Sequence, residues 1–551
     1  MGKRLGIDLG TTYSCISYVD ESGQVQFVES SDGNSQLTPS IVFFDPNGEV
    51  VVGSTARQEG AMNPECLVER VKNHMGNPDY SVNMNGTDYS ATAVSNLILR
   101  KLINDAEIWL GGEEIEGVVI TCPAYFGDNA RAATRAAGEQ VILSNGQNLK
   151  VFSILDEPTA AAIAYGSTIT EDVEKKVLIY DLGGGTFDCT IMQFKVLNGN
   201  SEMRVLATDG NHQLGGKDWD AALTNFVANR FCDATGDDVS EMLNDPDMRS
   251  WFSENIEKAK QTLSKKDMTA LTPNFNGNKE KIEITREDFD NETAILLEQT
   301  TSLIDKMLAE NSMTINDIDE IILVGGSTRM PQVTKLLEAT YAKPLISFDP
   351  DKAVSKGAAL VAKDYVESGE VPTFGGFDEP TTPTDAPANE ATKLFTLDGR
   401  EKIVYSICTK SYAIRFYNAG KPVFANLIKK GDPKPTANDM RSLPGFENGI
   451  QLSSGNEMID SVDILIVENN EMVDVVEDEG LVELIFVEEP IQFEGQLRAD
   501  TMMSVNMIVD KDGVLTVEIF DLENNKTYTL KPRRLGDEAN DCSNVNKITL
   551  R

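Results

Sequence analysis

Short apolar runs alternate with segments of helical periodicity from the first residue to about residue 365. The runs are rich in β-branched residues and predict strands at residues 117–122, 177–181 and 321–324. Apolar residues recur at three- and four-residue spacing between Val94 and Leu110, which predicts a helix with one buried face. Further long helices are expected at 246–264 and 286–309. Strands that alternate with helices are typical of an α/β fold.

The pattern changes after residue 365. Residues 366–393 contain four prolines, three glycines and few apolar side chains, and are predicted to form a linker. Beyond them the apolar residues alternate with a period of two, which predicts a meander of strands at 505–509, 515–520 and 527–530. We therefore expect an α/β domain at 1–365, a linker at 366–393, a β domain at 394–535 and a short polar tail at 536–551.

The charge of the chain narrows the range of partners. The 551 residues include 49 Lys and Arg against 88 Asp and Glu, which gives a net charge of −39. Nucleic acids and anionic membranes bind basic surfaces, so neither is an expected partner. The only two histidines, His74 and His212, are far apart in the sequence, which argues against a histidine metal centre and against a Ser-His-Asp hydrolase.

The cysteines and the apolar runs bear on location. Seven scattered cysteines without a C-x-x-C pair indicate reduced thiols. No apolar run approaches the roughly 18 residues of a membrane span, and the N-terminal segment does not contain the apolar core of a signal peptide. We expect a cytoplasmic protein.

Two glycine-rich turns share one design. One apolar strand ends in Asp8-Leu-Gly10-Thr11-Thr12-Tyr13, and a later one ends in Asp181-Leu-Gly183-Gly184-Gly185-Thr186-Phe-Asp188. Glycines let successive backbone N–H groups surround a phosphate, and aspartates at strand ends can hold Mg²⁺ through water. Either motif alone is also compatible with a tight hairpin that carries a structural aspartate. Their repetition favours two related lobes that clamp a triphosphate between them.

Other nucleotide signatures are incomplete. Gly215-Gly216-Lys217 is followed by Asp218 where a P-loop needs Ser or Thr, and no Rossmann glycine pattern follows a strand. A third glycine site, Gly325-Gly326-Ser327, lies between an apolar strand and a predicted helix. Arg329 in this segment could stack on a base through its guanidinium plane. The alternative for the segment is a packed strand–helix turn.

Together these segments resemble the 70-kDa heat-shock chaperone family of the DnaK type. The match covers both phosphate motifs (GIDLGTTYS and YDLGGGTFD), the adenosine motif (LVGGSTRMP), the segments at 121–131, 156–166, 214–218 and 349–359, and the β domain at 505–521. The resemblance implies a two-lobed, actin- and hexokinase-like (RNase H-like) ATPase domain followed by a β-sandwich-type substrate-binding domain. It also implies a chaperone that hydrolyses ATP with Mg²⁺ and binds extended or unfolded polypeptide under nucleotide control.

The resemblance assigns roles to the matching positions of this chain. Phosphate contacts are implied for Gly10, Thr11, Thr12, Tyr13, Gly183, Gly184, Gly185, Gly215 and Gly216. Asp8, Asp181 and Asp188 would orient hydrated Mg²⁺, and the catalytic group would be Lys72, Glu157, Asp181 and Thr186. Ribose and base contacts are implied for Glu257, Lys260, Ser264, Gly325, Gly326, Ser327, Arg329 and Asp351. Pro123 and Arg131 would relay the nucleotide state to the second domain.

The chain departs from the family pattern where the two domains communicate. The family has a short apolar linker; here residues 366–393 stand in its place, with Leu394-Phe395 and Ile403-Val404 as the apolar candidates nearby. Ser153 stands where the family carries an arginine that J-domains contact, and Gln261 replaces a basic residue that faces the adenine. We also expect no helical lid after the β domain.

These departures predict a working ATPase with weak coupling between its domains. The partners implied by the resemblance are a J-domain co-chaperone, whose effect should be small, and a nucleotide-exchange factor. An alternative is a scaffold or co-chaperone that uses ATP binding as a clamp and docks its β domain on one fixed protein partner. A small-molecule kinase of the same actin-like fold is a third hypothesis, in which the β domain would have no obvious task.

Overall fold

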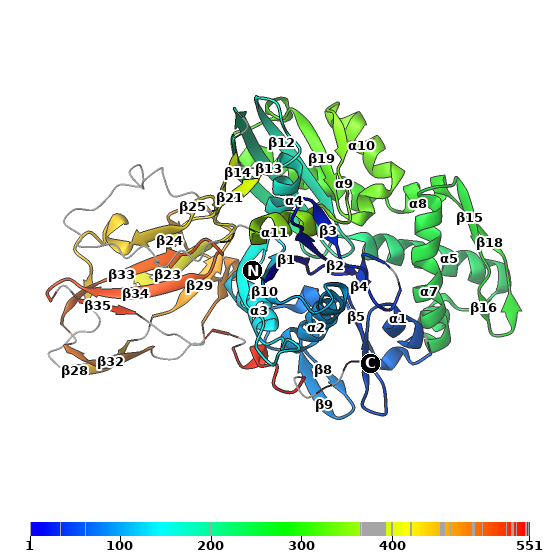
Figure 1. Ribbon diagram of the computed structural model, residues 1–551, viewed down its shortest axis with the longest axis horizontal. Helices are drawn as coiled ribbons and strands as arrows, with labels where there is room; N and C mark the ends of the chain where they lie inside the picture. Colours follow the sequence, from blue (N-terminus) through cyan, green and yellow to red (C-terminus); the bar gives the residue numbers. More distant parts are fainter. Residues whose placement is uncertain are drawn as a thin grey trace.

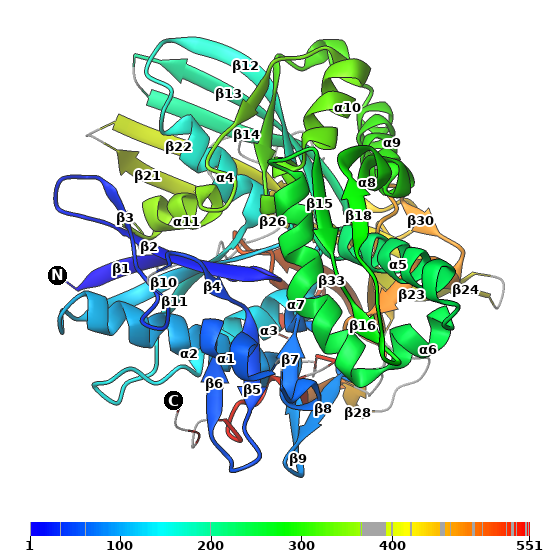
Figure 2. The same cartoon turned by 90° about the vertical axis from the view of Figure 1, so that its right-hand side faces the viewer.

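The computed structural model describes residues 2–33, 35–60, 62–198, 200–363, 365, 393–397, 400–418, 421–451, 458–462, 464–486, 491–498, 500–524, 526–529, 534–535, 537–545, 548 and 550. Apart from Lys393, the predicted linker at 366–393 lies outside the described residues. Figures 1 and 2 show two α/β lobes, with the β-rich C-terminal part on one side of them. Among the helices of these residues, none is both long enough and apolar enough to cross a membrane.

The first lobe, lobe I, is built on a mixed sheet in the order β11-β10-β1-β2-β3, with β4 paired to β2. The strands are β1 (Lys3–Asp8), β2 (Tyr13–Val19), β3 (Val25–Phe27), β4 (Thr38–Pro39), β10 (Ile115–Cys122) and β11 (Val151–Asp156). Strands β1, β10 and β11 run parallel, so Asp8 and Asp156 lie at the same edge of the sheet. Helices α2 (Ala91–Trp109) and α3 (Asp128–Glu139) share a hydrophobic core with these strands.

A small subdomain of lobe I borders the cleft between the lobes. It consists of β5 (Ile41–Phe44), β6 (Val50–Val52), α1 (Ser54–Gly60), β7 (Leu67–Glu69), the 3₁₀ helix η2 (Val71–His74) and the hairpin β8 (Ser81–Met84) and β9 (Thr87–Ser90). Strands β6, β5 and β7 form one antiparallel sheet. The subdomain carries Arg57 on α1 and Lys72 on η2.

The second lobe, lobe II, repeats the hairpin design of lobe I in a larger sheet. Its own strands are β12 (Val173–Leu182), β13 (Phe187–Leu197), β14 (Asn200–Asn211), β19 (Glu320–Val324) and β20 (Leu345–Ser347). Strands β12 and β13 pair with Asp181 opposite Asp188, as β1 and β2 pair with Asp8 opposite Cys15. Helices α4 (Glu157–Gly166) and α11 (Ala353–Lys363) form a core with strands of both lobes and therefore join them.

Helices cover the other face of lobe II and extend it along the cleft. They are α5 (Gly216–Thr235), α6 (Val239–Asn244), α7 (Pro246–Leu263), α8 (Arg286–Glu292), α9 (Ala294–Glu310) and α10 (Pro331–Tyr341), with hairpins β15 (Met268–Leu271) and β18 (Ile282–Thr285), and β16 (Asn274–Phe275) and β17 (Asn278–Lys279). The expected single helix at 286–309 is two helices. Thr293 interrupts it because its hydroxyl donates to the Phe289 carbonyl and to Gln332, at a backbone φ of −112° and ψ of 5°.

The C-terminal β part is a sandwich of two sheets. One sheet has the order β30-β24-β23-β29-β31 and the other β26-β33-β34-β35, with β27 paired to β33. Side chains from both sheets form one hydrophobic core. The strands are β23 (Ser411–Asn418), β24 (Lys421–Ile428), β26 (Thr436–Asp439), β27 (Ile450–Gln451), β29 (Ile466–Asn469), β30 (Val475–Val476), β31 (Val482–Leu484), β33 (Met502–Val509), β34 (Leu515–Asp521) and β35 (Lys526–Thr529), besides a separate pair, β28 (Met458–Val462) and β32 (Ile491–Arg498).

Two strands just after the predicted linker belong to the sheet of lobe II. Strand β22 (Arg400–Ile407) pairs parallel to β14, with Ile403 opposite Glu202 and Val404 opposite Met203, and β21 (Lys393–Leu397) pairs antiparallel to β22. The Val404 side chain is fully buried in the core shared by the two lobes. Figure 2 shows β21 and β22 continuing the sheet of β12, β13 and β14. An apolar connection to the β part therefore exists, and it docks by strand addition.

The segment after the β sandwich returns to lobe I. Its 3₁₀ helix η7 (Glu538–Asn540) contacts α2 and α3, where Gln140 donates to the Asn540 carbonyl (2.6 Å) and accepts from the Cys542 N–H (2.8 Å). Arg100 donates to the Val545 carbonyl at 2.7 Å. Cys542 and Val545 are fully buried in the lobe I core. This tail, expected to be merely polar, is an integral part of lobe I.

Candidate functional site

The two glycine turns meet face to face between the lobes. In the lobe II turn, the Gly183 N–H donates to the Thr186 carbonyl at 2.9 Å and closes the hairpin. A Cβ on Gly184 would collide with the Thr12 hydroxyl, and a Cβ on Gly185 would lie 2.7 Å from the Thr11 methyl group. Only glycine permits this approach, so the structure places both predicted phosphate turns at one point in the cleft.

The loop before α5 adds a third glycine segment, Gly215-Gly216, to the two turns. The three segments together are called the glycine cradle. The Gly216 N–H donates to the Gly183 carbonyl (3.0 Å), and the Ser327 hydroxyl donates to the same carbonyl (2.8 Å). A Cβ on Gly215 would lie about 2.5 Å from backbone atoms of Gly185. Three glycine segments that are far apart in the sequence therefore meet at one place, which is an arrangement suited to phosphate.

Four carboxylates, three of them buried and the fourth, Asp8, half-buried, surround the glycine turns. Asp8 ends β1, Asp181 lies at the end of β12, Asp188 lies on β13, and Glu157 begins α4. Burial, together with the charge of Glu157, raises the pKa of Asp8 to about 7 and the pKa of Asp181 to about 8. The same causes raise the pKa of Asp188 well above its usual range. This site favours a bound cation, because a positive charge would relieve the repulsion between the carboxylates.

The residues present fit a hydrated Mg²⁺ ion. One carboxylate oxygen of Asp188 is buried without a hydrogen-bond partner among the described residues, which a bound cation with its waters would explain. Within the same part of the chain, no three acidic, cysteine or histidine side chains converge closely enough to ligate an ion directly. Mg²⁺ keeps several of its waters and is commonly held through them, so Asp8, Asp181 and Asp188 suit it as acceptors for those waters.

Lys72 brings one positive charge into this acidic site. Its ammonium forms an ion pair with Glu157, and both residues are more than nine-tenths buried. Burial disfavours the ammonium, but the charges of Glu157 and Asp8 outweigh it and raise the pKa of Lys72. Lys72 therefore keeps its positive charge at neutral pH and can act as a hydrogen-bond donor fixed in place. Thr186, whose side chain is also buried, lies in the lobe II turn itself.

Helix α7 and the segment at 325–329 form the other end of the site. The Lys260 ammonium donates to the Gly216 carbonyl (2.9 Å) and pairs with Asp220 (2.8 Å). Arg329 forms an ion pair with Asp351, and a Cβ on Gly326 would lie 3.1 Å from Asp351. These residues adjoin the glycine cradle as expected for contacts to a ribose and a base.

Two residues expected to contact the ribose or the base, Ser264 and Gly325, make contacts within the protein itself. The Ser264 hydroxyl donates to the Lys260 carbonyl one turn back in its own helix, at 3.1 Å. A Cβ on Gly325, which has φ of +84°, would collide with the Leu182 carbonyl, so this glycine is required by the close approach of β12. Gln261, which replaces a basic residue, donates to Glu257 (3.3 Å).

A contact across the cleft was not predicted. The Tyr13 hydroxyl donates to Glu257 on α7 at 3.3 Å and accepts from Arg57 at 2.9 Å, and the expected phosphate contact of Tyr13 stays a prediction. Arg57 also lies 3.5 Å from the Glu257 carboxylate. Tyr13 and Arg57 belong to lobe I and Glu257 to lobe II, so this trio links the lobes above the site. No local motif around Arg57 marks it in the sequence.

Of the two residues expected to relay the nucleotide state, Arg131 contacts the β part. Arg131 on α3 is buried, pairs with Asp156 (2.6 Å) and donates to the Asp512 carbonyl (3.3 Å) in the β33–β34 turn. Asp156 also pairs with Lys434 of the β part at 3.2 Å. Pro123 ends the buried run of β10, and its carbonyl accepts from the Phe126 N–H at 3.2 Å. Asp156 therefore connects the site edge of lobe I to the sandwich.

Further polar contacts surround this junction. The Ser153 hydroxyl donates to the Asp512 carboxylate, and Arg135 pairs with the same group at 2.7 Å. Asp128 at the start of α3 accepts from the Leu515 N–H (2.9 Å) and pairs with Arg534 (2.5 Å). A short serine thus occupies the position where the family carries an arginine, and the β part fills the space beside it.

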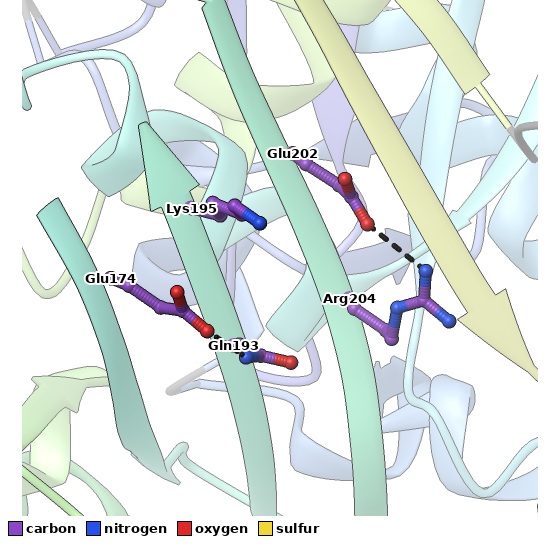
Figure 3. A pocket seen from close by; sticks show the side chains of 5 residues that line it. All are labelled: Glu174, Gln193, Lys195, Glu202 and Arg204. Atoms are coloured by element: carbon purple, nitrogen blue, oxygen red, sulfur yellow. Dashed lines mark hydrogen bonds and ion pairs between the residues drawn. The ribbon is translucent and has the colours of Figure 1, made fainter. Parts of the chain in front are cut away.

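A separate polar hollow lies on the sheet of lobe II. It has a volume of about 270 Å³ and is lined by Glu174, Gln193, Lys195, Glu202 and Arg204 of β12, β13 and β14 (Figure 3). Gln193 donates to Glu174 (2.9 Å), and Arg204 pairs with Glu202 (2.9 Å) while its guanidinium lies 4.6 Å from the centre of the Tyr405 ring on β22. The hollow therefore borders the docked strand and is distinct from the glycine cradle.

Comparisons with known proteins agree with this geometry. A sequence model of the family described as Hsp70 protein matches residues 4–374, more than half of the chain. Chaperone protein DnaK of Thermotoga petrophila is 38% identical over 459 residues, covering 78% of this chain and 72% of the relative. The protein of the same name from Thermosipho africanus is 36% identical over 454 residues, with the same shares of both chains. The chain belongs to the Hsp70 family.

Proposed function

We propose that the protein is a molecular chaperone that binds and hydrolyses ATP between its two lobes and binds extended or unfolded polypeptide in its β sandwich. The observation that carries this function is the meeting of the two glycine turns beside three buried carboxylates, the half-buried Asp8 and Lys72. The family and the relatives named chaperone protein DnaK support the same function. Hydrolysis is a transfer of the terminal phosphoryl group to water.

The residues of the chain act by positioning and by fixed charge. Backbone N–H groups of the two facing glycine turns that make no internal hydrogen bond would bind phosphate oxygens, and Lys260, Glu257 and Arg329 would hold the nucleoside. Lys72, held in place by Glu157, would donate a hydrogen bond to the terminal phosphate or to the attacking water. When bound, Mg²⁺ neutralises charge on the phosphates. Preorganised donors of this kind do not have to reorient during the reaction, which lowers its barrier.

The β sandwich is connected to both lobes, so a relative movement of the lobes must change at least one connection. Strand β22 joins it to lobe II, and the contacts of Asp156, Ser153 and Asp128 join it to lobe I. We propose that the nucleotide state acts on polypeptide binding through these two connections. The proposed partners are unfolded polypeptides and co-chaperones, with a nucleotide-exchange factor and a weakly acting J-domain among them.

One observation favours a second candidate function. The sandwich is tied to lobe I by the buried Asp156–Lys434 and Asp128–Arg534 pairs and again by the tail that carries Cys542 and Val545. A sandwich fixed in this way suits a scaffold or co-chaperone that holds one protein partner and uses ATP as a clamp. The small-molecule kinase hypothesis has no support from the family of the chain.

The two functions are separated by one experiment. The purified chain is mixed with an unfolding client protein, and aggregation is followed with ATP, with ADP and without nucleotide. A chaperone should suppress aggregation in a nucleotide-dependent way, and Glu157→Ala should remove that dependence while it retains ATP binding. No suppression of any client, together with one tight partner in a pull-down, would favour the scaffold.

The free cysteines support a reducing location, and we propose the cytoplasm. All seven cysteines, each of which is described, are free thiols, and six of them are buried. Burial raises the pKa of the Cys15, Cys122, Cys408 and Cys542 thiols to about 12, so these are unreactive.

A further inference from the structure

The side-chain amide of Asn73 lies beside the glycine turns and has no partner among the residues of the site. Asn73 follows Lys72 in η2, and its amide oxygen is buried without a hydrogen-bond partner among the described residues. Its backbone N–H is already used, since it donates to the Arg70 carbonyl at 3.1 Å. A buried amide oxygen without a partner is uncommon in a folded protein and requires an explanation.

The position of this amide relates it to the two phosphate turns. The Asn73 oxygen lies 3.3 Å from the place of a Cβ on Gly185, and the Thr11 side chain borders the same place. Asn73 is thus a lobe I side chain that lies against Gly185 of the lobe II turn, where this turn meets Thr11 of the lobe I turn. The carboxamide carries two N–H donors besides this oxygen, and a rotation about its terminal bond exchanges the oxygen and nitrogen positions.

The contacts of the lobe II turn indicate which phosphate of a bound nucleotide would lie nearest to Asn73. Ser327, which belongs to the segment expected at the base end, donates to the carbonyl of Gly183 at the start of the turn. Asn73 lies against Gly185, two residues further on and next to Lys72 in the sequence. The end of the turn that Asn73 touches is therefore the end remote from Ser327 and close to the proposed terminal phosphate.

We propose that Asn73 is a residue that distinguishes ATP from ADP, by donating a carboxamide N–H to an oxygen of the terminal phosphate. This inference rests on the proposed ATP site. A phosphate oxygen accepts hydrogen bonds and does not donate them, so this contact uses the carboxamide orientation in which the NH₂ group takes the place of the unpartnered oxygen. It also gives lobe I a second contact to the terminal phosphate besides Lys72, so that the presence of this phosphate draws the Asn73 side chain and the Gly185 turn together.

The test compares the dissociation constants of ADP and of a non-hydrolysable ATP analogue, both with Mg²⁺, for the full chain and four variants. Asn73→Asp keeps the shape but replaces the donor by a negative charge, and Asn73→Ala removes the group. We expect the analogue to bind about 10-fold more weakly or worse to either variant, while ADP affinity changes less than about 3-fold. Asn63→Ala, a matched change on an exposed residue of the same subdomain, should change neither constant.

The outcomes separate this inference from the function on which it rests. If the unaltered chain binds neither nucleotide, the ATP site itself is wrong. If it binds both and the two Asn73 variants retain the original ratio of the constants, Asn73 does not contact the terminal phosphate. Equal weakening of both nucleotides also contradicts the inference, since it would indicate a structural role. Asn73→Gln, which retains the donor, should recover part of the ratio if the other variants unfold.

Discussion

The Lys72 ammonium is hydrogen-bonded to the Glu157 carboxylate at the point where η2 meets the start of α4. Both side chains are almost fully excluded from water, although they belong to elements that are 85 residues apart in the sequence. Removing one member of such a pair leaves an uncompensated charge in a site of low polarity. The Lys72–Glu157 pair therefore contributes both to the stability of the site and to the proposed hydrolysis.

Replacement of Lys72 by alanine should lower the rate of single-turnover hydrolysis by about 10²–10³, because one preorganised charged donor is lost. Affinity for ATP should change much less. The matched control is Lys175→Ala, which breaks the Lys175–Glu320 pair (2.5 Å) on lobe II, remote from the cleft. The control should retain hydrolysis; a normal rate in Lys72→Ala would remove Lys72 from the catalytic group.

Asp181 should make the nucleotide-free protein less stable as the pH rises. The folded state holds the pKa of this carboxyl at about 8, above its ordinary value, so between about pH 4 and pH 8 the folded state binds more protons than the unfolded state. Asp181→Asn should therefore change stability little at pH 4 and stabilise the nucleotide-free chain increasingly up to pH 8, by at most about 1.4 kcal/mol per pH unit. Thermal unfolding across this range, with and without Mg²⁺, measures the effect. If the stabilisation by Asp181→Asn does not increase with pH, the pKa of the Asp181 carboxyl is not raised in the folded state.

Arg57→Ala should accelerate nucleotide release by about 3–10-fold, because it removes the hydrogen bond to Tyr13 and the ion pair with Glu257 that cross the cleft. Release of a fluorescent ADP, followed by stopped flow, measures the rate. Arg230→Ala is the control, since Arg230 pairs with Asp288 (3.5 Å) within lobe II alone. Identical release rates in the two variants would mean that the cleft opens without breaking the Arg57 contacts.

Asp512→Ala should reduce the effect of ATP on polypeptide affinity by about 10-fold while leaving basal hydrolysis within about 2-fold, because Asp512 accepts from Ser153 and Arg135 at the junction of lobe I and the sandwich. Peptide binding is measured with ATP and with ADP. Asp500→Ala, which breaks the exposed pair with Arg498 inside the β part, is the matched control. If both variants behave alike, the junction at Asp512 does not transmit the nucleotide state.

Val545→Asp should destabilise lobe I by about 3 kcal/mol or more, because it places a carboxylate in the lobe I core. Ser543→Asp introduces the same group two residues earlier at an exposed position and should have little effect. The measurement is denaturant unfolding followed by the fluorescence of Trp109 on α2, after Trp219 and Trp251 have been replaced. Equal stability of the two variants would show that the tail is not held in that core.

Much of the fold follows from local patterns. The apolar run at 117–122 lies within β10, and the helical period from Val94 to Leu110 corresponds to α2. The glycine turns are predictable for the same reason, since aspartate and glycine after an apolar strand favour a turn. Repetition of that design at Asp8 and Asp181 also indicates two lobes.

Other features depend on contacts between distant segments and leave no local pattern. Thr293 divides the helix expected at 286–309 because its hydroxyl finds a partner in Gln332, 39 residues away. Arg57 and Asn73 acquire their places only when the lobes close on each other. The burial of Val545 depends on a surface of α2 and α3 that is more than 400 residues away along the chain, as is its partner Arg100.

The return of the tail to lobe I closes the chain into a ring. The described chain passes from lobe I to lobe II through α4, from lobe II to the sandwich through β22, and from the sandwich back to lobe I through η7 and Val545. In an open chain of domains, each can melt at its own temperature. Here the loss of any one of these three connections weakens the other two. Lobe I and the sandwich should therefore melt together in a single calorimetric transition. Proteolytic cutting before η7 should divide that transition into two.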